Sequence, residues 1–148
     1  ELTWCRVGND GMESISAHKT LEVLDVANTQ VTDPGLEQIA KLENLRWLNL
    51  SHLRITNEGL KEITALKNLE YLDLGSTKIT SAGITLLSEL PKLTELSLRA
   101  DPKVGSKGAL FLKDMKNLKK IDLRSAKVSR EALTELKEAL PEAEINWY

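Results

Sequence analysis

The chain has 148 residues, a length that suits one domain with a continuous hydrophobic core. Hydrophobic residues make up 41% of the sequence, charged residues make up 28%, and the formal net charge is −2. The composition is typical of a globular protein. The charge balance gives no overall attraction to nucleic acid or to an anionic membrane surface, so neither is expected as a partner.

Cysteine content and hydropathy limit the setting further. The single cysteine, Cys5, cannot form an intramolecular disulfide, so nothing indicates the disulfide framework of a secreted domain. This favours a cytoplasmic setting, although the compartment itself stays open. No apolar run approaches the roughly 20 residues that a membrane-spanning helix needs, so membrane insertion is not expected.

One pattern recurs along the chain with a period close to 24 residues. Copies start at Leu21, Leu45 and Leu69, where 45 − 21 and 69 − 45 both equal 24. Further copies start at Leu93 and Leu118, the last step being 118 − 93 = 25. An internal repeat of this length predicts a stacked solenoid.

Each copy changes its hydrophobic period partway through. In the copy that starts at Leu45, Leu48 and Leu50 alternate with Trp47 and Asn49, which indicates a short strand with one buried face. After the strand the apolar residues recur at a spacing of three, the pattern of a short helix: Leu60, Ile63 and Leu66. The repeat unit is therefore predicted to be strand, turn, helix and return.

The helix starts are also marked in the sequence. Asn57 is expected to cap one helix with Glu58 in its first turn, and Asp33-Pro34 supplies a cap acceptor and a proline at the first helical position. A glycine recurs once per repeat in the first turn, where we expect a structural role and not phosphate binding: Gly35, Gly59 and Gly83.

The terminal units depart from the pattern. Residues 1–20 match only part of a repeat, so we predict that Glu1 is an excision point in a longer protein, or that this uncapped end packs on a second copy as a homodimer. In the unit that starts at Leu93, RADPKV (Arg99–Val104) holds one residue more than its counterpart and lengthens the loop after the strand. A closing strand is predicted near 144–148, within a single domain that spans 1–148.

The copies LEVLDVANTQVTDPGLEQIAKLEN (Leu21–Asn44) and LEYLDLGSTKITSAGITLLSELPK (Leu69–Lys92) resemble leucine-rich repeats, whose core reads LxxLxLxxN/C/TxL. The phrases VTDPGL, ITNEGL and ITSAGI are similar to the bacterial variant ITDxGL, close to the cysteine-containing class. The resemblance implies an α/β fold, a right-handed curved solenoid with parallel strands on the concave face and short helices on the convex face. It also implies protein–protein binding through the concave face, often as one module of a larger protein.

One position of the family pattern is degenerate in this sequence. The Asn/Cys/Thr site is filled in turn by Cys5, Thr29, Leu53, Thr77, Asp101 and Ala126. In the family this side chain bonds backbone groups of the loop, which Leu53 and Ala126 cannot do. Ordered water or tighter apolar packing is expected to compensate there.

Stacked strands about 4.8 Å apart would align equivalent residues in columns across the concave face. The first column contains Val23, Trp47, Tyr71, Glu95 and Lys120, and the second contains Asp25, Asn49, Asp73, Ser97 and Asp122. The third contains Thr3, Ala27, Ser51, Gly75, Arg99 and Arg124, and the fourth contains Trp4, Asn28, His52, Ser76, Ala100 and Ser125.

The candidate binding residues lie on these columns. Trp47 and Tyr71 are predicted to be exposed side by side amid polar groups, as binding hot spots are. Alternatively, the two rings only cover the strand backbone and pack on each other. The full candidate set is Asp25, Trp47, Asn49, His52, Tyr71, Asp73, Arg99 and Arg124.

Charge on this face is predicted to be split along the solenoid. Carboxylates come early in the chain (Glu22, Asp25, Glu70 and Asp73), and basic residues come late (Arg99, Lys119, Lys120 and Arg124). Such a split would orient a partner of opposite polarity. A solvated surface of mixed charge is the alternative.

Catalytic and metal-binding hypotheses have less support. Cys5 would be a nucleophile only if it met His18 or His52. Asp25 and Asp73, roughly 10 Å apart, lack a cleft that would shift either pKa for acid–base work. A cation site of Asp25, Asn49 and Asp73 is conceivable from the oxygen ligands alone. We therefore expect no enzyme activity, no cofactor and no metal.

The sequence thus predicts a non-catalytic interaction module that binds a protein or peptide on its concave face. Two alternatives stay open: a regulatory or substrate-docking domain of a larger enzyme, and a carbohydrate-binding surface formed by the two aromatic rings.

Overall fold

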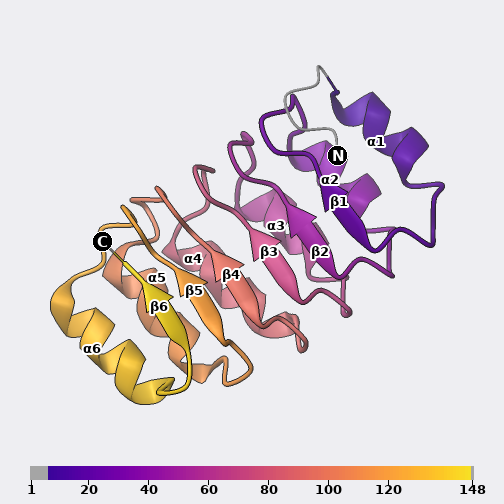
Figure 1. Cartoon of the computed structure of the whole chain (residues 1–148). Coiled ribbons are helices and arrows are strands. Elements are labelled where there is room, and N and C mark those ends of the chain that lie inside the picture. The colour runs from indigo at the N-terminus through magenta and orange to yellow at the C-terminus, as the bar shows by residue number, and fades with distance from the viewer. Residues whose placement is uncertain (1–6, 148) are drawn as a thin grey trace.

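The computed structural model describes residues 7–147, in which strand and helix alternate along the chain (Figure 1). The strands within this part have three residues each: β1 (Val23–Asp25), β2 (Trp47–Asn49), β3 (Tyr71–Asp73), β4 (Glu95–Ser97), β5 (Lys120–Asp122) and β6 (Glu144–Asn146). The helices are α1 (Asn9–Ile15), α2 (Asp33–Ile39), α3 (Asn57–Ile63), α4 (Ser81–Ile84), α5 (Gly105–Phe111) and α6 (Arg130–Ala139). Short 3-10 helices continue α4 and α5: η1 (Thr85–Glu89) and η2 (Leu112–Asp114).

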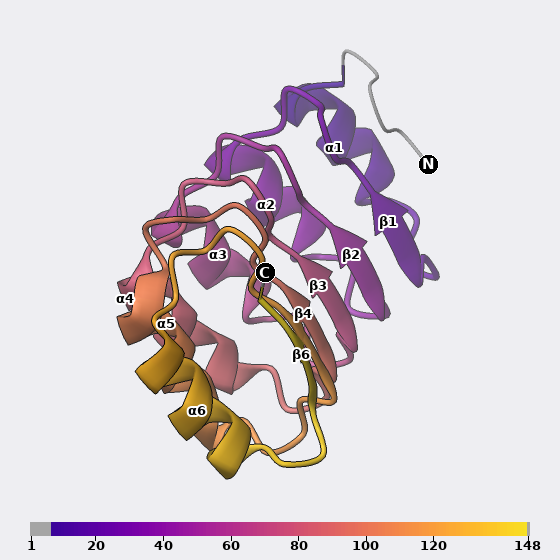
Figure 2. The same ribbon diagram turned by 60° about the vertical axis from the view of Figure 1, so that its left-hand side comes forward.

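The strands form one parallel sheet in the order β1-β2-β3-β4-β5-β6. Each residue pairs with its equivalent one repeat away, so Trp47 lies opposite Val23 on one side and Tyr71 on the other. The predicted columns are therefore confirmed for the strand positions. Figures 1 and 2 show the helices on one side of the sheet, as in a right-handed solenoid with a concave strand face and a convex helix face.

The core lies between these two layers and continues from repeat to repeat. Leu48 and Leu50 of the β2 segment and Leu60 and Ile63 of α3 have no solvent-exposed surface, as predicted from the two periodicities. Replacing one such leucine by alanine typically costs about 2–5 kcal/mol, because both transfer energy and a cavity are involved. Because every repeat contributes the same positions, the core has no internal boundary.

Polar bridges connect the helix starts of neighbouring repeats. The Asp33 carboxylate accepts from the Thr56 backbone N–H at 2.8 Å and from the Thr56 hydroxyl at 2.7 Å. The Asn57 amide repeats this one unit later, accepting from the Thr80 N–H at 3.1 Å and donating to the Thr80 hydroxyl at 2.9 Å. Each bridge satisfies a backbone group that would otherwise be unpaired in a half-buried loop.

The predicted helix caps were wrong by one residue. The caps are Thr32 and Thr56, whose backbones are extended, and Asp33 and Asn57 are the first helical residues. The Thr56 hydroxyl also accepts from the Glu58 N–H at 3.3 Å. The Asp33 and Asn57 side chains point to the following repeat and not back to their own helices, because the hydroxyl groups of Thr56 and Thr80 are available there as partners.

The recurrent glycines make room for the bridges. A Cβ atom on Gly59 would lie 2.4 Å from the Asp33 Oδ1 atom, and one on Gly83 would lie 2.3 Å from the Asn57 Oδ1 atom. Both separations are well inside van der Waals contact. The phrase DPGL or NEGL thus encodes an outgoing bridge at its first residue and a gap for the incoming bridge at its glycine.

A double-mutant cycle tests this pairing. Gly59→Ala is expected to cost about 1–3 kcal/mol of unfolding free energy in the unaltered chain, because the added methyl group meets the Asp33 carboxylate. In an Asp33→Ala background the same change should cost clearly less. Chemical denaturation of the four proteins measures the coupling.

The matched control is Gly83→Ala combined with Asp33→Ala. Gly83 contacts the next bridge, so its cost should be independent of Asp33. Equal coupling for Gly59 and Gly83, or none for either, would contradict the steric assignment.

Candidate functional site

An apolar strip crosses the first three strands of the concave face. Val23 is 60% exposed, and beside it the rings of Trp47 and Tyr71 stack with their centroids 4.7 Å apart and their planes 7° from parallel. The rings are half-buried, whereas the sequence predicted them to be exposed, because each covers one face of the other. They lie side by side as predicted, and the exposed Val23 extends their apolar surface.

The Tyr71 hydroxyl lies in a partly dry and acidic environment. Burial, together with the carboxylates of Asp73, Glu95 and Asp25, raises the pKa of Tyr71 to about 12. A hydrogen bond with the Asp73 carboxylate contributes to the same shift, so the phenol stays protonated well into the alkaline range.

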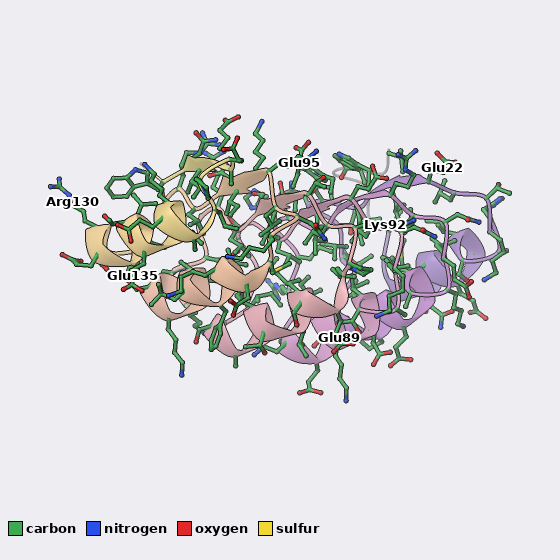
Figure 3. All side chains as sticks on the ribbon, turned by 90° about the horizontal axis from the view of Figure 1, so that it is seen from below. Glu22, Glu89, Lys92, Glu95, Arg130 and Glu135 are labelled. Atoms are coloured by element: carbon green, nitrogen blue, oxygen red, sulfur yellow. The ribbon has the colours of Figure 1, made fainter. Side chains whose placement is uncertain are left out.

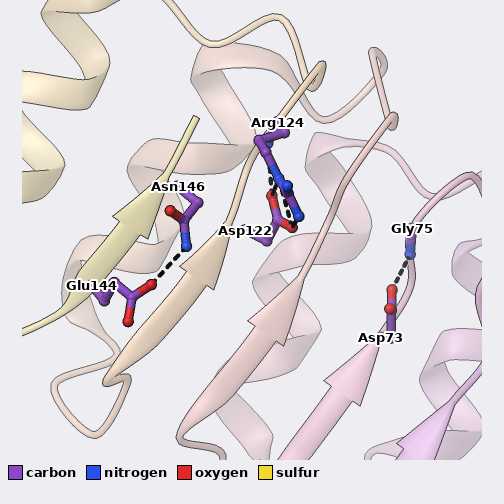
Figure 4. A network of polar contacts seen from close by, with 6 residues as sticks. All are labelled: Asp73, Gly75, Asp122, Arg124, Glu144 and Asn146. Atoms are coloured by element: carbon purple, nitrogen blue, oxygen red, sulfur yellow. Dashed lines mark hydrogen bonds and ion pairs between the residues drawn. The ribbon is translucent and has the colours of Figure 1, made fainter. Parts of the chain in front are cut away.

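The acidic column has a structural role that the sequence analysis missed. Oδ1 of Asp25, Asn49 and Asp73 accepts from the backbone N–H two residues later, at 3.0, 3.0 and 2.8 Å (the Asp73–Gly75 bond appears in Figure 4). This is the local turn that Asx side chains favour, and it ends each strand. The recurrence of Asp or Asn at the last strand position was the signal that could have predicted it.

The second carboxylate oxygen of Asp25 forms a hydrogen bond to the neighbouring strand. Asn49 donates from its amide nitrogen to Oδ2 of Asp25 at 3.3 Å. Asp25 and Asp73 lie two strands apart on an open sheet, each tied to its own turn. The two carboxylates therefore lie apart on an open surface and do not form an enclosed acid–base pair.

His52 belongs to the turn after β2 and not to the strand face. Its φ angle is 61°, in the left-handed region, and the equivalent residues Asn28, Ser76, Ala100 and Ser125 share this conformation with φ of 57–60°. The fourth predicted column is therefore a row of left-handed turns. His52 remains exposed and lines a shallow hollow of about 280 Å³ with Ser51, Ser76 and Arg99.

The predicted split of charge is partly neutralised by ion pairs. Arg124 binds both carboxylate oxygens of Asp122, with Nε at 2.9 Å from Oδ1 (Figure 4), and Arg46 binds Glu70 at 2.8 Å. Burial opposes ionisation of Asp122, but the hydrogen bonds and charge of Arg124 lower its pKa below the usual value. The charge asymmetry that remains along the face comes from carboxylates in the first repeats and from basic residues in the last ones. The carboxylates are Glu22, Asp25 and Asp73, and the basic residues are Arg99 and Lys120.

A second hollow joins Tyr71 to the late basic residues. It has a volume of about 290 Å³ and extends from Tyr71 and Asp73 past Glu95 to Lys120 and Arg124. In the side view of Figure 3, Glu22 and Glu95 project from the sheet side, whereas Glu89 and Glu135 project from the helix side. Because Glu95 lines it, the second hollow lies on the strand face.

Another hollow lies elsewhere, on the helix side. It holds about 390 Å³ between η1 and η2 and is lined by Ile84, Met115 and Phe111, which is 40% exposed. The α-helix of this repeat is short: α4 has only four residues and is continued by the 3-10 helix η1.

Asp101 is a buried acid in the lengthened loop beside Arg99. The residue is 1% exposed, Oδ1 accepts from the Thr77 N–H at 2.8 Å, and no hydrogen-bond partner for Oδ2 is present within residues 7–147. Burial, together with the charge of Asp73, raises the pKa of Asp101 to about 7, although the Thr77 hydrogen bond acts in the opposite direction. The degenerate repeat position therefore places a proton-binding group under the concave face.

The other degenerate positions differ in chemistry. The Thr29 hydroxyl donates to the Val26 carbonyl at 2.7 Å, as the family pattern implies. Leu53 and Ala126 are fully buried, so apolar packing occupies those two sites.

Some predicted features lie outside the described residues. Cys5, Leu2, Thr3 and Trp4 are among the residues that are not described. The nucleophile hypothesis, which needs Cys5, and the homodimer hypothesis, which concerns this end of the chain, therefore stay predictions. His18 is exposed after α1. Within residues 7–147 no group of three His, Cys, Asp or Glu side chains is placed to hold a metal ion, and no helix there is long and apolar enough to cross a membrane.

Comparison with known proteins agrees with this architecture. The family model described as leucine-rich repeat region matches residues 2–146, so the chain belongs to the leucine-rich repeat family. No curated protein sequence matches the chain.

Solved structures of bacterial proteins are similar in fold. An internalin (inlF) from Listeria monocytogenes superposes with a TM-score of 0.70 at 22% identity, covering 89% of this chain and 36% of that one. Internalin C2 of the same species gives 0.68 at 26% identity, covering 92% and 55%. A leucine-rich repeat protein of Leptospira interrogans gives 0.62 at 24%, covering 89% and 38%. The chain thus spans about a third to a half of these proteins.

The Asp101 carboxyl predicts a pH-dependent stability. The unfolded chain loses this proton near pH 4 and the folded chain near pH 7, so the folded state binds the extra proton between these values. Its contribution is complete below about pH 4 and falls by about 1.4 kcal/mol per pH unit until pH 7. Asp101→Asn should remove this slope in denaturation curves recorded from pH 4 to 8.

An exposed carboxyl serves as the control. Asp114→Asn removes a side chain in η2 and should leave the slope in place. If Asp101→Asn follows the pH profile of the unaltered protein, the buried-proton assignment is wrong.

The Tyr71 environment predicts its titration. With Tyr148 replaced by phenylalanine, phenolate absorbance reports Tyr71 alone and should have its midpoint near pH 12 when folded, against 10 for an ordinary tyrosine. Because the folded pKa is the higher one, the stabilising contribution is present below pH 10 and is lost as pH rises to 12. A midpoint near 10 would mean that the ring is fully solvated.

Proposed function

We propose that this chain is a non-catalytic module that binds a protein or peptide on its concave face. The observation that carries the proposal is the strip of Val23, Trp47 and Tyr71, an apolar surface left open on an otherwise polar sheet. Apolar and aromatic side chains surrounded by hydrogen-bonding groups are what energetically dominant contacts of protein interfaces consist of. Membership of the leucine-rich repeat family supports the same function.

The contacts around the strip are polar and can be satisfied by a polypeptide. Asp25, Asn49 and Asp73 lie on one side of the strip, and His52, Arg99 and Arg124 lie at the ends of the strands. The backbone turns hold the Asx side chains in fixed positions. Little side-chain entropy is then lost on binding, which favours affinity.

The geometry of the rings favours a protein over a carbohydrate. Sugars stack on the free faces of aromatic rings, but Trp47 and Tyr71 are parallel and cover one face of each other. The exposed ring edges and the Val23 side chain suit contacts with apolar side chains of a partner.

The proposal is tested by removing both rings. Trp47→Ala with Tyr71→Ala is expected to weaken binding at least about 100-fold, because two hot-spot side chains together supply roughly 3 kcal/mol or more. A partner is first isolated by affinity capture with the unaltered chain. Its affinity for both forms of the chain is then measured with purified components.

Phe111→Ala is the matched control, because Phe111 is an exposed aromatic residue on the helix side. It should leave the affinity unchanged, and thermal melting should show that all variants fold. If the double variant binds as well as the unaltered chain, the site is misplaced. Loss of binding with Phe111→Ala instead would move the interface to the convex face.

A further inference from the structure

The basic residues at the late end of the concave face differ in how they are paired. Arg99 follows β4, Lys120 lies on β5 and Arg124 follows β5; we call these three the β4–β5 basic cluster. Arg124 is held by Asp122, whereas neither Arg99 nor Lys120 forms an ion pair with a carboxylate in residues 7–147. Two cations of the cluster thus have bonding capacity left for a partner.

The cluster and Tyr71, one ring of the aromatic pair, share one hollow. The 290 Å³ depression begins at Tyr71 and ends among the three basic side chains, with Leu96 and Ser97 at its floor. Asp73 and Glu95 border it on the Tyr71 side. A ligand lying in this hollow would therefore meet an aromatic surface and acceptors first and cations last.

The register fixes the distance between these two parts. Tyr71 pairs with Glu95 on β4, which pairs with Lys120 on β5. Two strand spacings separate Tyr71 from Lys120, which is about 10 Å. A segment in the extended polyproline II conformation covers this distance in about three residues, since each residue rises about 3.1 Å, and its three residues per turn place side chains i and i+3 on the same side.

The charges around the apolar strip oppose a carboxylate there. The strip of Val23, Trp47 and Tyr71 is flanked by the carboxylates of Glu22, Asp25 and Asp73. The nearby cation Arg46 already forms an ion pair with Glu70. A carboxylate placed on the strip would be repelled, whereas the same group over the β4–β5 basic cluster would be attracted. The face therefore distinguishes the two ends of a partner segment.

We propose that the partner is an extended protein segment that places an apolar side chain on the Val23–Trp47–Tyr71 strip and a carboxylate, about three residues away, on the β4–β5 basic cluster. This inference rests on the proposed function and adds the chemistry and the orientation of the partner. The apolar side chain provides most of the affinity, and the carboxylate selects the direction in which the segment crosses the sheet.

Short fluorescein-labelled peptides in a serine–glycine background test the proposal. Each carries a phenylalanine and, three residues away, a glutamate, a lysine or a serine; a further peptide has serine in place of the phenylalanine. Fluorescence anisotropy with the unaltered chain should show the phenylalanine–glutamate peptide binding about tenfold more tightly than the phenylalanine–lysine peptide. High salt should reduce this difference.

Two charge variants locate the effect. Arg99→Gln with Lys120→Gln should abolish the preference for glutamate over lysine while phenylalanine still contributes. Arg130→Gln with Lys107→Gln removes two exposed cations from the helix side and should leave the preference intact. Trp47→Ala with Tyr71→Ala should weaken all phenylalanine peptides equally.

The outcomes separate the two proposals. If phenylalanine peptides bind through Trp47 and Tyr71 with no preference between glutamate and lysine, the orientation is overturned and the concave-face function stands. The same conclusion follows if the preference persists in Arg99→Gln with Lys120→Gln. If no peptide binds, or if binding ignores both aromatic residues, the proposed function fails as well.

Discussion

The structure depends on one constraint, the constant spacing that brings equivalent residues of successive repeats together. Because each repeat presents the same positions, an Asp33 or Asn57 side chain always finds a threonine of the following unit at hydrogen-bonding distance. At Gly59 and Gly83 an added Cβ atom would clash with the bridging side chain of the preceding repeat. An Asp or Asn bridge in one repeat therefore favours glycine in the next.

The same constraint produces the binding face. In a sheet whose strands pair in register, side chains that are 24 residues apart in sequence become neighbours, which is why Trp47 and Tyr71 stack. It also places the acidic column beside the aromatic pair. One oxygen of Asp25 or Asp73 ends the strand, and the backbone bond fixes the position of the carboxylate. In the proposed function, stability and recognition would share these residues.

The chemistry of the surface changes at the positions where the sequence departs from the repeat pattern. The lengthened loop of the fourth full unit buries Asp101 two residues after Arg99, and within residues 7–147 one carboxyl oxygen has no hydrogen-bond partner. This unit contributes Arg99 to the basic cluster, and the next unit contributes Lys120 and Arg124. A regular solenoid would have continued the columns unchanged, whereas this one changes from apolar to basic between β3 and β5.

The sequence by itself determined the architecture, because hydrophobic residues at periods of two and three repeat with a period near 24 and leave few alternatives for the core. It also placed the columns, including the aromatic pair, since parallel register follows from repeat length. It did not determine which polar side chains are already occupied. The Arg124–Asp122 and Arg46–Glu70 pairs, the threonine caps and the left-handed turn at His52 depend on which groups meet in three dimensions. The raised pKa of Asp101 was likewise decided by the tertiary structure, because desolvation depends on neighbours from other repeats and not on local sequence.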